Sequence, residues 1–152
     1  MNDRFKFRAW DIKNGCFVEE NDYSISFDGV ELIECVYDPS HEEFVWSGTC
    51  GDDFILMQCT GLKDKNGNLI YEGDMVKFDS DDGPVVVLWG EIDTSDWDND
   101  RTAGDHCHGW GVEYPDHVTG EPYTDLCGLM DEEYYTEVIG NIYENPELLE
   151  GE

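Results

Sequence analysis

The residues best suited to metal chemistry lie together at 106–108, where His106 and His108 flank Cys107. Imidazole nitrogen and thiolate sulfur are the ligands that Zn²⁺ prefers. Four residues elsewhere carry suitable side chains to complete a ligand set: Cys50, Cys59, His117 and Cys127. The spacing lacks the paired C-x₂-C or H-x₃-H pattern of structural zinc sites, and in a strand both histidines would face away from Cys107. We therefore predict no metal here and a half-buried thiol beside a loop.

A second group of charged residues surrounds Trp97. Four carboxylates lie within eight residues of sequence: Asp93, Asp96, Asp98 and Asp100. They resemble a calcium-binding loop, but the glycine and the distal glutamate of such a loop are missing. The surrounding segment, 90–109, is polar and rich in Asp and Gly, which predicts a long exposed loop. We predict that these acids and Trp97 form part of a protein-docking surface, because aromatic residues anchor interfaces and acids add salt-dependent attraction.

The net charge narrows the choice of partner. The chain has 37 acidic and 8 basic residues, a formal charge of −29. Residues 1–77 hold 16 acids and 7 bases, whereas residues 78–152 hold 21 acids and one base, Arg101. Direct binding to nucleic acid is disfavoured, because its phosphates carry the same sign. The charge favours a basic protein partner, although excess acid also serves solubility alone.

Short apolar runs separated by turn signals predict a mainly β fold. Residues 5–10 alternate apolar and basic side chains, as a half-buried strand does. Asn14-Gly15, Asp28-Gly29 and Asn66-Gly67 supply hairpin turns. About ten short strands follow from this pattern. No apolar run approaches the ~20 residues of a membrane helix, and no signal core follows the N-terminus. We therefore predict a cytoplasmic protein with reduced cysteines, of which Cys59 packs as a small apolar residue.

The stretch 62–78, LKDKNGNLIYEGDMVKF, poses the choice between a catalytic loop and the bend of a small barrel. Its glycines do not form a phosphate loop, because Asp-Met-Val follows Gly73 where Lys-Ser/Thr would be needed. Asn66-Gly67 predicts a tight turn with a positive φ. In residues 71–74 we expect a diverging turn whose acids, Glu72 and Asp74, accept backbone amide bonds. We therefore predict that this stretch has a structural role, as a bend between barrel strands, and not a catalytic one.

Three blocks of this sequence are individually distinctive: FKFRAW at 5–10, LMQCTGLKDKNGNLIYEGDMVKF at 56–78 and VIGNIYENPELL at 138–149. Together, and in this order, they resemble the signature blocks of the YopX family of phage and prophage proteins. The resemblance implies an origin in a phage or an integrated element and a mainly β protein with an SH3-like barrel in its C-terminal part. We expect an N-terminal β segment (1–58) packed on that barrel (59–152). It implies no enzymatic activity and offers no catalytic residues to carry over.

These observations favour a non-enzymatic accessory protein of a bacterial host cell. Its expected partner is a basic host protein that binds nucleic acid or acts in defence, and the acidic surface would then imitate nucleic acid. Two alternatives remain open: a binder of a small ligand or nucleotide in a pocket between the two β halves, and a metal-dependent enzyme centred on 106–127. We expect no cofactor and no membrane association. The sequence leaves homo-oligomerisation open.

Overall fold

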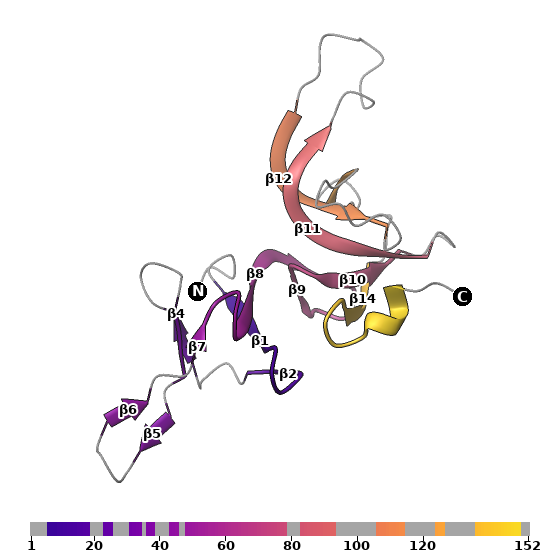
Figure 1. The fold of residues 1–152 in the computed structure, drawn as a ribbon. Helices are drawn as coiled ribbons and strands as arrows, with labels where there is room; N and C mark the ends of the chain where they lie inside the picture. Colours follow the sequence, from indigo (N-terminus) through magenta and orange to yellow (C-terminus); the bar gives the residue numbers. More distant parts are fainter. Residues whose placement is uncertain are drawn as a thin grey trace, which may run out of the picture. The chain divides into compact units, whose positions relative to one another are not determined.

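The computed structural model describes residues 6–18, 23–25, 31–34, 36–38, 43–45, 48–78, 83–93, 106–114, 124–126 and 136–149. Strands make up most of these residues (Figure 1), which confirms the mainly β class. The chain divides into two compact units, Phe5–Gln58 and Cys59–Glu152. None of the described residues form a helix with the length and apolar character needed to cross a membrane.

The first unit is built from short antiparallel strands. They are β1 (Phe7–Asp11), β2 (Cys16–Phe17), β3 (Tyr23–Ile25), β4 (Glu31–Glu34), β5 (Val36–Asp38), β6 (Glu43–Val45), β7 (Gly48–Thr49) and the beginning of β8 (Phe54–Lys63). β1 pairs with β2 on one side and with β8 on the other, while β3-β4-β7 and β5-β6 form separate small sheets. Asn14-Gly15 makes the predicted β1–β2 turn, in which Gly15 has a φ of 63°.

The second unit contains a five-stranded antiparallel sheet of order β13-β12-β11-β10-β14. Its strands are β10 (Asp74–Lys77), β11 (Pro84–Asp93), β12 (His106–Glu113), β13 (Thr124–Asp125) and β14 (Glu137–Asn141). The sheet curls strongly along β11 and β12 (Figure 1). The end of β8 pairs with β9 (Leu69–Tyr71). That this curled sheet is an SH3-like barrel, with the N-terminal segment packed on it, stays a prediction.

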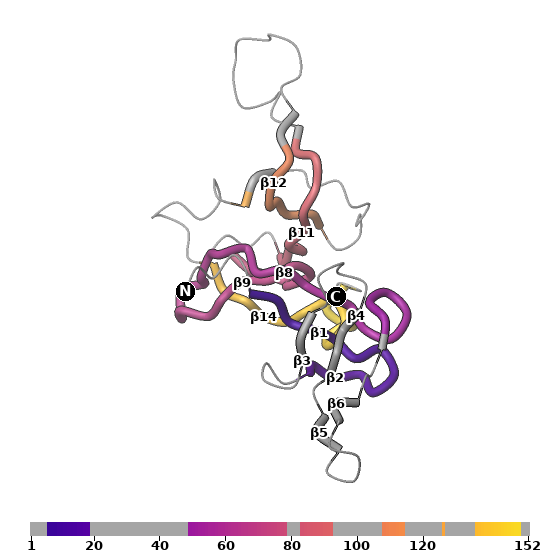
Figure 2. The backbone as a smooth tube through the Cα atoms, turned by 90° about the vertical axis from the view of Figure 1, so that its left-hand side faces the viewer, coloured from indigo at the N-terminus to yellow at the C-terminus, as the bar shows by residue number. Residues whose placement is uncertain are grey.

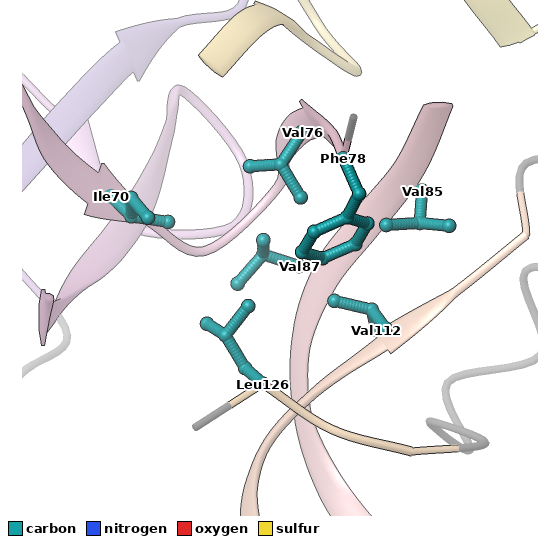
Figure 3. Packing of buried hydrophobic residues seen from close by; sticks show 7 residues of the cluster. All are labelled: Ile70, Val76, Phe78, Val85, Val87, Val112 and Leu126. Atoms are coloured by element: carbon teal, nitrogen blue, oxygen red, sulfur yellow. The ribbon is translucent and has the colours of Figure 1, made fainter. Parts of the chain in front are cut away.

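Buried apolar side chains of the described residues form a cluster on the inner face of the curled sheet. Its buried members converge from several strands (Figure 3): Ile70, Val76, Phe78, Val85, Val87, Val112 and Leu126. Most are β-branched, which suits the pleated surface of a sheet. Burying each such side chain contributes about 1.5–3 kcal/mol relative to leaving it in water. The cluster therefore holds the parts of β11 and β12 around Val87 and Val112 in the core of the unit.

The turn at residues 64–68 has the conformation expected of Asn-Gly. Gly67 has a φ of 86°, which confirms the prediction of a positive value. The Asp64 carboxylate accepts hydrogen bonds from the backbone amides of Asn66 (2.9 Å) and Asn68 (2.8 Å). The turn is therefore closed by its own acidic side chain, as in an Asx turn.

The same turn is fastened to β14. The Lys65 amide donates to the Thr136 carbonyl at 2.8 Å, and the Val138 amide donates to the Asp64 carboxylate at 3.4 Å. The Lys65 ammonium pairs with the Glu137 carboxylate at 2.7 Å. Asp64 is 6% exposed, so its carboxylate is committed to these bonds. The contacts assign an architectural role to this turn.

A second turn joins β9 to β10 at residues 71–74. The buried Asp74 carboxylate accepts from the Tyr71 amide at 2.8 Å and from the Asn141 side-chain amide at 3.3 Å. Gly73 has a φ of 76° and donates its amide to the Val87 carbonyl. This confirms the amide-accepting role predicted for Asp74, while the same role for Glu72 stays a prediction.

The chain after β14 folds back on itself and ends in a short 3₁₀ helix, η3 (Pro146–Leu149). The Asn141 amide donates to the Asn145 side-chain oxygen at 3.2 Å, and the Asn145 amide donates to the Asn141 carbonyl at 2.8 Å. The helix begins at Pro146, because the fixed φ of proline suits a first helical position. These contacts order the final sequence block.

Candidate functional site

β11 and β12 form the longest strand pair among the described residues. Eight residue pairs are in register, from Val86 opposite Glu113 to Asp93 opposite His106. The two strands run side by side in both views (Figure 1 and Figure 2). The expectation of an exposed loop over 90–109 is therefore wrong at both ends, since β11 continues to Asp93 and β12 begins at His106. Residues 94–105 lie outside the described residues.

One face of this pair changes from buried to exposed along its length. Residues two apart on a strand share a face, so Val85, Val87 and Trp89 project to the same side of β11. Val85 and Val87 belong to the apolar cluster, whereas Trp89 is 54% exposed. It is the most exposed large apolar side chain among the described residues. The face of β11 that packs on the core at Val85 and Val87 is therefore exposed to solvent at Trp89.

Trp89 meets Trp110 at this transition. The two residues lie directly opposite each other in the register of β11 and β12. Their ring centroids are 5.1 Å apart with an interplanar angle of 76°, an edge-to-face arrangement. Trp110 is half-buried and packs against the apolar cluster. Since one ring is anchored in the core, the pair holds the exposed indole of Trp89 in a defined orientation.

The same face becomes polar one step beyond the tryptophans. Glu91 lies opposite His108, and both side chains are exposed. Glu91 is two residues from Trp89 and therefore projects to the same side. Neither β11 nor β12 contains a lysine or an arginine. The exposed face thus combines an aromatic surface with a carboxylate and a histidine, and its two strands add no lysine or arginine.

The opposite face of the strand pair is closely packed. Ile92 is fully buried, and its terminal methyl would lie 3.5 Å from a Cβ atom on Gly109. The Ile92 side chain therefore reaches across to β12 beside Gly109, at an ordinary contact distance. Toward the end of β11, Ile92 is therefore buried while Trp89, on the other side of the strand, is exposed.

Comparison with known proteins gives the chain a family. The model of the YopX family, described as YopX protein, matches residues 6–150. The chain belongs to the YopX family. No curated protein matches it at a significant level. Among solved structures, it is similar to protein EF1440 from Enterococcus faecalis, with 26% identity and a TM-score of 0.55, over 95% of this chain and 96% of that one.

The acidic docking residues predicted in this YopX-family chain fall mostly outside the described residues. Asp93 is the last residue of β11 and pairs in register with His106. The other four lie in the segment that the structure does not describe: Asp96, Trp97, Asp98 and Asp100. Their role in docking stays a prediction. The structure does show that β11 leads directly from Trp89 to the first of them.

The candidate metal ligands can be placed only in part. The backbone of His106 and Cys107 lies in β12, and His108 is exposed on the same strand. Cys127 lies outside the described residues. Within the described part of the chain, no three His, Cys, Asp or Glu side chains are grouped so that they could hold a metal ion. Cys59 is fully buried and is not in a disulfide, and its burial agrees with the prediction that it packs as a small apolar residue.

Reasoning from the sequence missed the pairing of Trp89 with Trp110 in this YopX protein. A polar segment of about twenty residues separates the two tryptophans in the sequence. The sequence pattern that would have revealed the pair is Trp89-Gly90 followed later by Gly109-Trp110. The two glycines lie opposite each other in the register, next to the tryptophan pair. A symmetrical hairpin register places the two indoles opposite each other.

Proposed function

We propose that this YopX-family protein is a non-enzymatic accessory protein, of phage or prophage origin, that binds a basic protein of the bacterial cytoplasm. Its target is a host protein that binds nucleic acid or acts in defence. The binding surface comprises the exposed end of β11 and the acidic residues that follow it: Asp93, Asp96, Trp97, Asp98 and Asp100. The acids imitate the charge of nucleic acid.

The observation that carries this proposal is the exposed indole of Trp89 beside the exposed carboxylate of Glu91. A large aromatic ring in water is unfavourable unless a partner covers it. Tryptophan is also the residue most enriched among those that dominate binding energies at interfaces. An orienting pair with Trp110 limits the entropy lost on binding, since the ring is held before the partner arrives.

The net charge of −29 favours a partner of opposite charge. A concentration of one sign of charge accelerates the encounter with a partner of the opposite sign and rejects partners of the same sign. Solvent-exposed charges are screened by salt, so the attraction must weaken as ionic strength rises. Acids alone would attract any basic protein. The aromatic contact is what provides selectivity.

Affinity capture from a bacterial lysate tests this function. The wild-type chain should recover a basic protein at about 50 mM salt and lose most of it at about 200 mM. A variant with Asp93→Asn, Asp96→Ser, Asp98→Asn and Asp100→Ser should lose most recovery while remaining folded. Its stability should not fall, because removing like charges relieves repulsion.

A control variant separates a local site from total charge. Asp52→Asn, Asp53→Asn, Glu144→Gln and Glu147→Gln remove the same four charges from exposed positions elsewhere. This control should capture the partner as wild type does. If both variants, or neither, lose the partner, the segment after β11 is not the docking site and the proposal is overturned.

A further inference from the structure

The geometry at Trp89 specifies which group of a partner would bind there, an inference that rests on the proposed function and refines it. An indole ring carries negative charge density on its face and attracts cations that lie within about 6 Å of its centre. Trp89 leaves more than half of its surface accessible, and its edge-to-face partner Trp110 is anchored against the core. The pair is therefore a fixed aromatic surface for a cation.

The carboxylate of Glu91 lies on the same side of β11 as this surface, two residues further along. A group that meets both must be positively charged and able to donate hydrogen bonds next to an aromatic plane. The guanidinium of arginine meets this requirement better than an ammonium. It is planar, stacks on aromatic faces, is weakly hydrated and donates in a fork that fits a carboxylate.

The two strands contain no lysine or arginine, and the residue that lies opposite Glu91 across the strands is the exposed His108. The first unit contains a cation–π contact of this kind within the chain. There the Arg8 guanidinium lies 4.7 Å from the centre of the Phe17 ring. Trp89 offers the same type of surface facing outward.

We propose that Trp89, Trp110 and Glu91 form a binding site for an arginine side chain of a basic protein partner. Trp89 contributes the ring on which the guanidinium stacks. Trp110 fixes the orientation of that ring, and Glu91 accepts hydrogen bonds from the guanidinium nitrogens. The site turns non-selective attraction by acids into recognition of one residue type.

Nuclear magnetic resonance with short peptides tests the site on the full chain. The protein has five tryptophans, and each gives one indole N–H signal that single substitutions assign. An uncharged-end peptide of alternating arginine and glycine should shift the signals of Trp89 and Trp110 more than those of the other three. The same peptide with citrulline, which has the shape of arginine without its charge, should cause no shift. A lysine version should bind more weakly.

Two substitutions and a matched control give the size of the effect. Trp89→Ala should weaken binding of the arginine peptide about three- to tenfold, the range expected for removing a cation–π contact. Glu91→Gln should weaken it about twofold or more, as for an exposed charge pair. Tyr114→Ala removes another exposed aromatic side chain, immediately after β12, and should leave the affinity unchanged.

The outcomes separate this site from the wider function. If Trp89→Ala binds the arginine peptide as tightly as wild type, or if the shifts fall on other indoles, the arginine site is overturned. A lysine peptide that binds as tightly as the arginine peptide overturns the preference for arginine. The capture experiment reads out the proposed function separately, because its four-aspartate variant keeps Trp89, Trp110 and Glu91 intact.

Discussion

Gly140 and Asn145 lie so close together that a Cβ atom on residue 140 would come within 2.7 Å of the Asn145 side-chain oxygen. The same atom would lie 2.9 Å from a methyl group of Leu148 in η3. The Asn145 oxygen cannot easily move away, because it accepts the hydrogen bond from the Asn141 amide. Glycine at position 140 is therefore what allows the chain after β14 to fold back.

Gly140→Ala should destabilise the protein by about 1–3 kcal/mol, the usual cost of forcing extra atoms into a packed site. Chemical denaturation of wild type and variant measures the difference. Gly109→Ala is the matched control, since a Cβ there meets only the Ile92 methyl, at an ordinary contact distance of 3.5 Å. Equal stability of Gly140→Ala and wild type would show that the folded-back segment is loosely held.

Gly67→Val should also destabilise the protein, for a different reason. A Cβ at this position meets nothing within 4 Å, so there is no clash, but the φ of 86° is unfavourable for a β-branched residue. We expect a loss of about 1 kcal/mol or more. Gly67→Asn should cost less, because asparagine tolerates this region of φ. A thermal melt of both variants checks the order, and a neutral valine variant would contradict it.

Asp64 should make stability depend on pH. Burial acts to raise the pKa of this carboxyl, but hydrogen bonds from Asn68, Val138 and Asn66 outweigh it, so the pKa lies below its ordinary value of 3.8. A carboxyl with a depressed pKa stabilises the fold above the pKa of the unfolded chain. That stabilisation is lost as the pH falls through the folded pKa.

Asp64→Asn should therefore cost about 1–3 kcal/mol at neutral pH, because an amide nitrogen would face groups that also donate. The difference in free energy of unfolding between Asp64→Asn and wild type should become smaller as the pH falls below about 4. Taking the difference between the two proteins cancels the global effect of neutralising the other acids. Asp52→Asn, at an exposed position, should follow wild type at every pH. A gap that stays constant with pH would rule out this role for Asp64.

The cysteines should differ in reactivity rather than form a structural bond. Cys16 is exposed, Cys50 is partly buried and Cys59 is fully buried, and none of these three is in a disulfide. Burial raises the pKa of the Cys50 thiol, which lowers the fraction of reactive thiolate. A thiol reagent should label Cys16 first, then Cys50 and last Cys59, as peptide mass spectrometry would show. Reductant should leave the melting temperature unchanged to within about two degrees; a large drop would reveal a disulfide.

What the sequence predicted well are features set by neighbouring residues. The positive φ of Gly67 follows from the needs of an Asn-Gly turn. The burial of Cys59 follows from the apolar run around it. None of these depends on a distant part of the chain.

What the sequence could not provide depends on partners far along the chain. The bond between the Asp64 carboxylate and the Val138 amide joins residues 74 positions apart. The extension of β11 and β12 was missed because glycine, glutamate and histidine at 90, 91 and 108 have low strand propensity, which their mutual pairing overrides. The candidate arginine site arises from that register, which places Trp89 opposite Trp110 and which composition alone does not reveal.

The hydrogen bonds along β14 have a consequence for self-association. In the described sheet β14 is an outer strand, paired with β10 on one side only. An unpaired strand is a template for a strand of another molecule. Here the Val138 amide is taken by the Asp64 side chain and the Asn141 amide by the Asn145 side chain. With these donors occupied from within the chain, β14 is protected against the edge-to-edge growth that leads to aggregation.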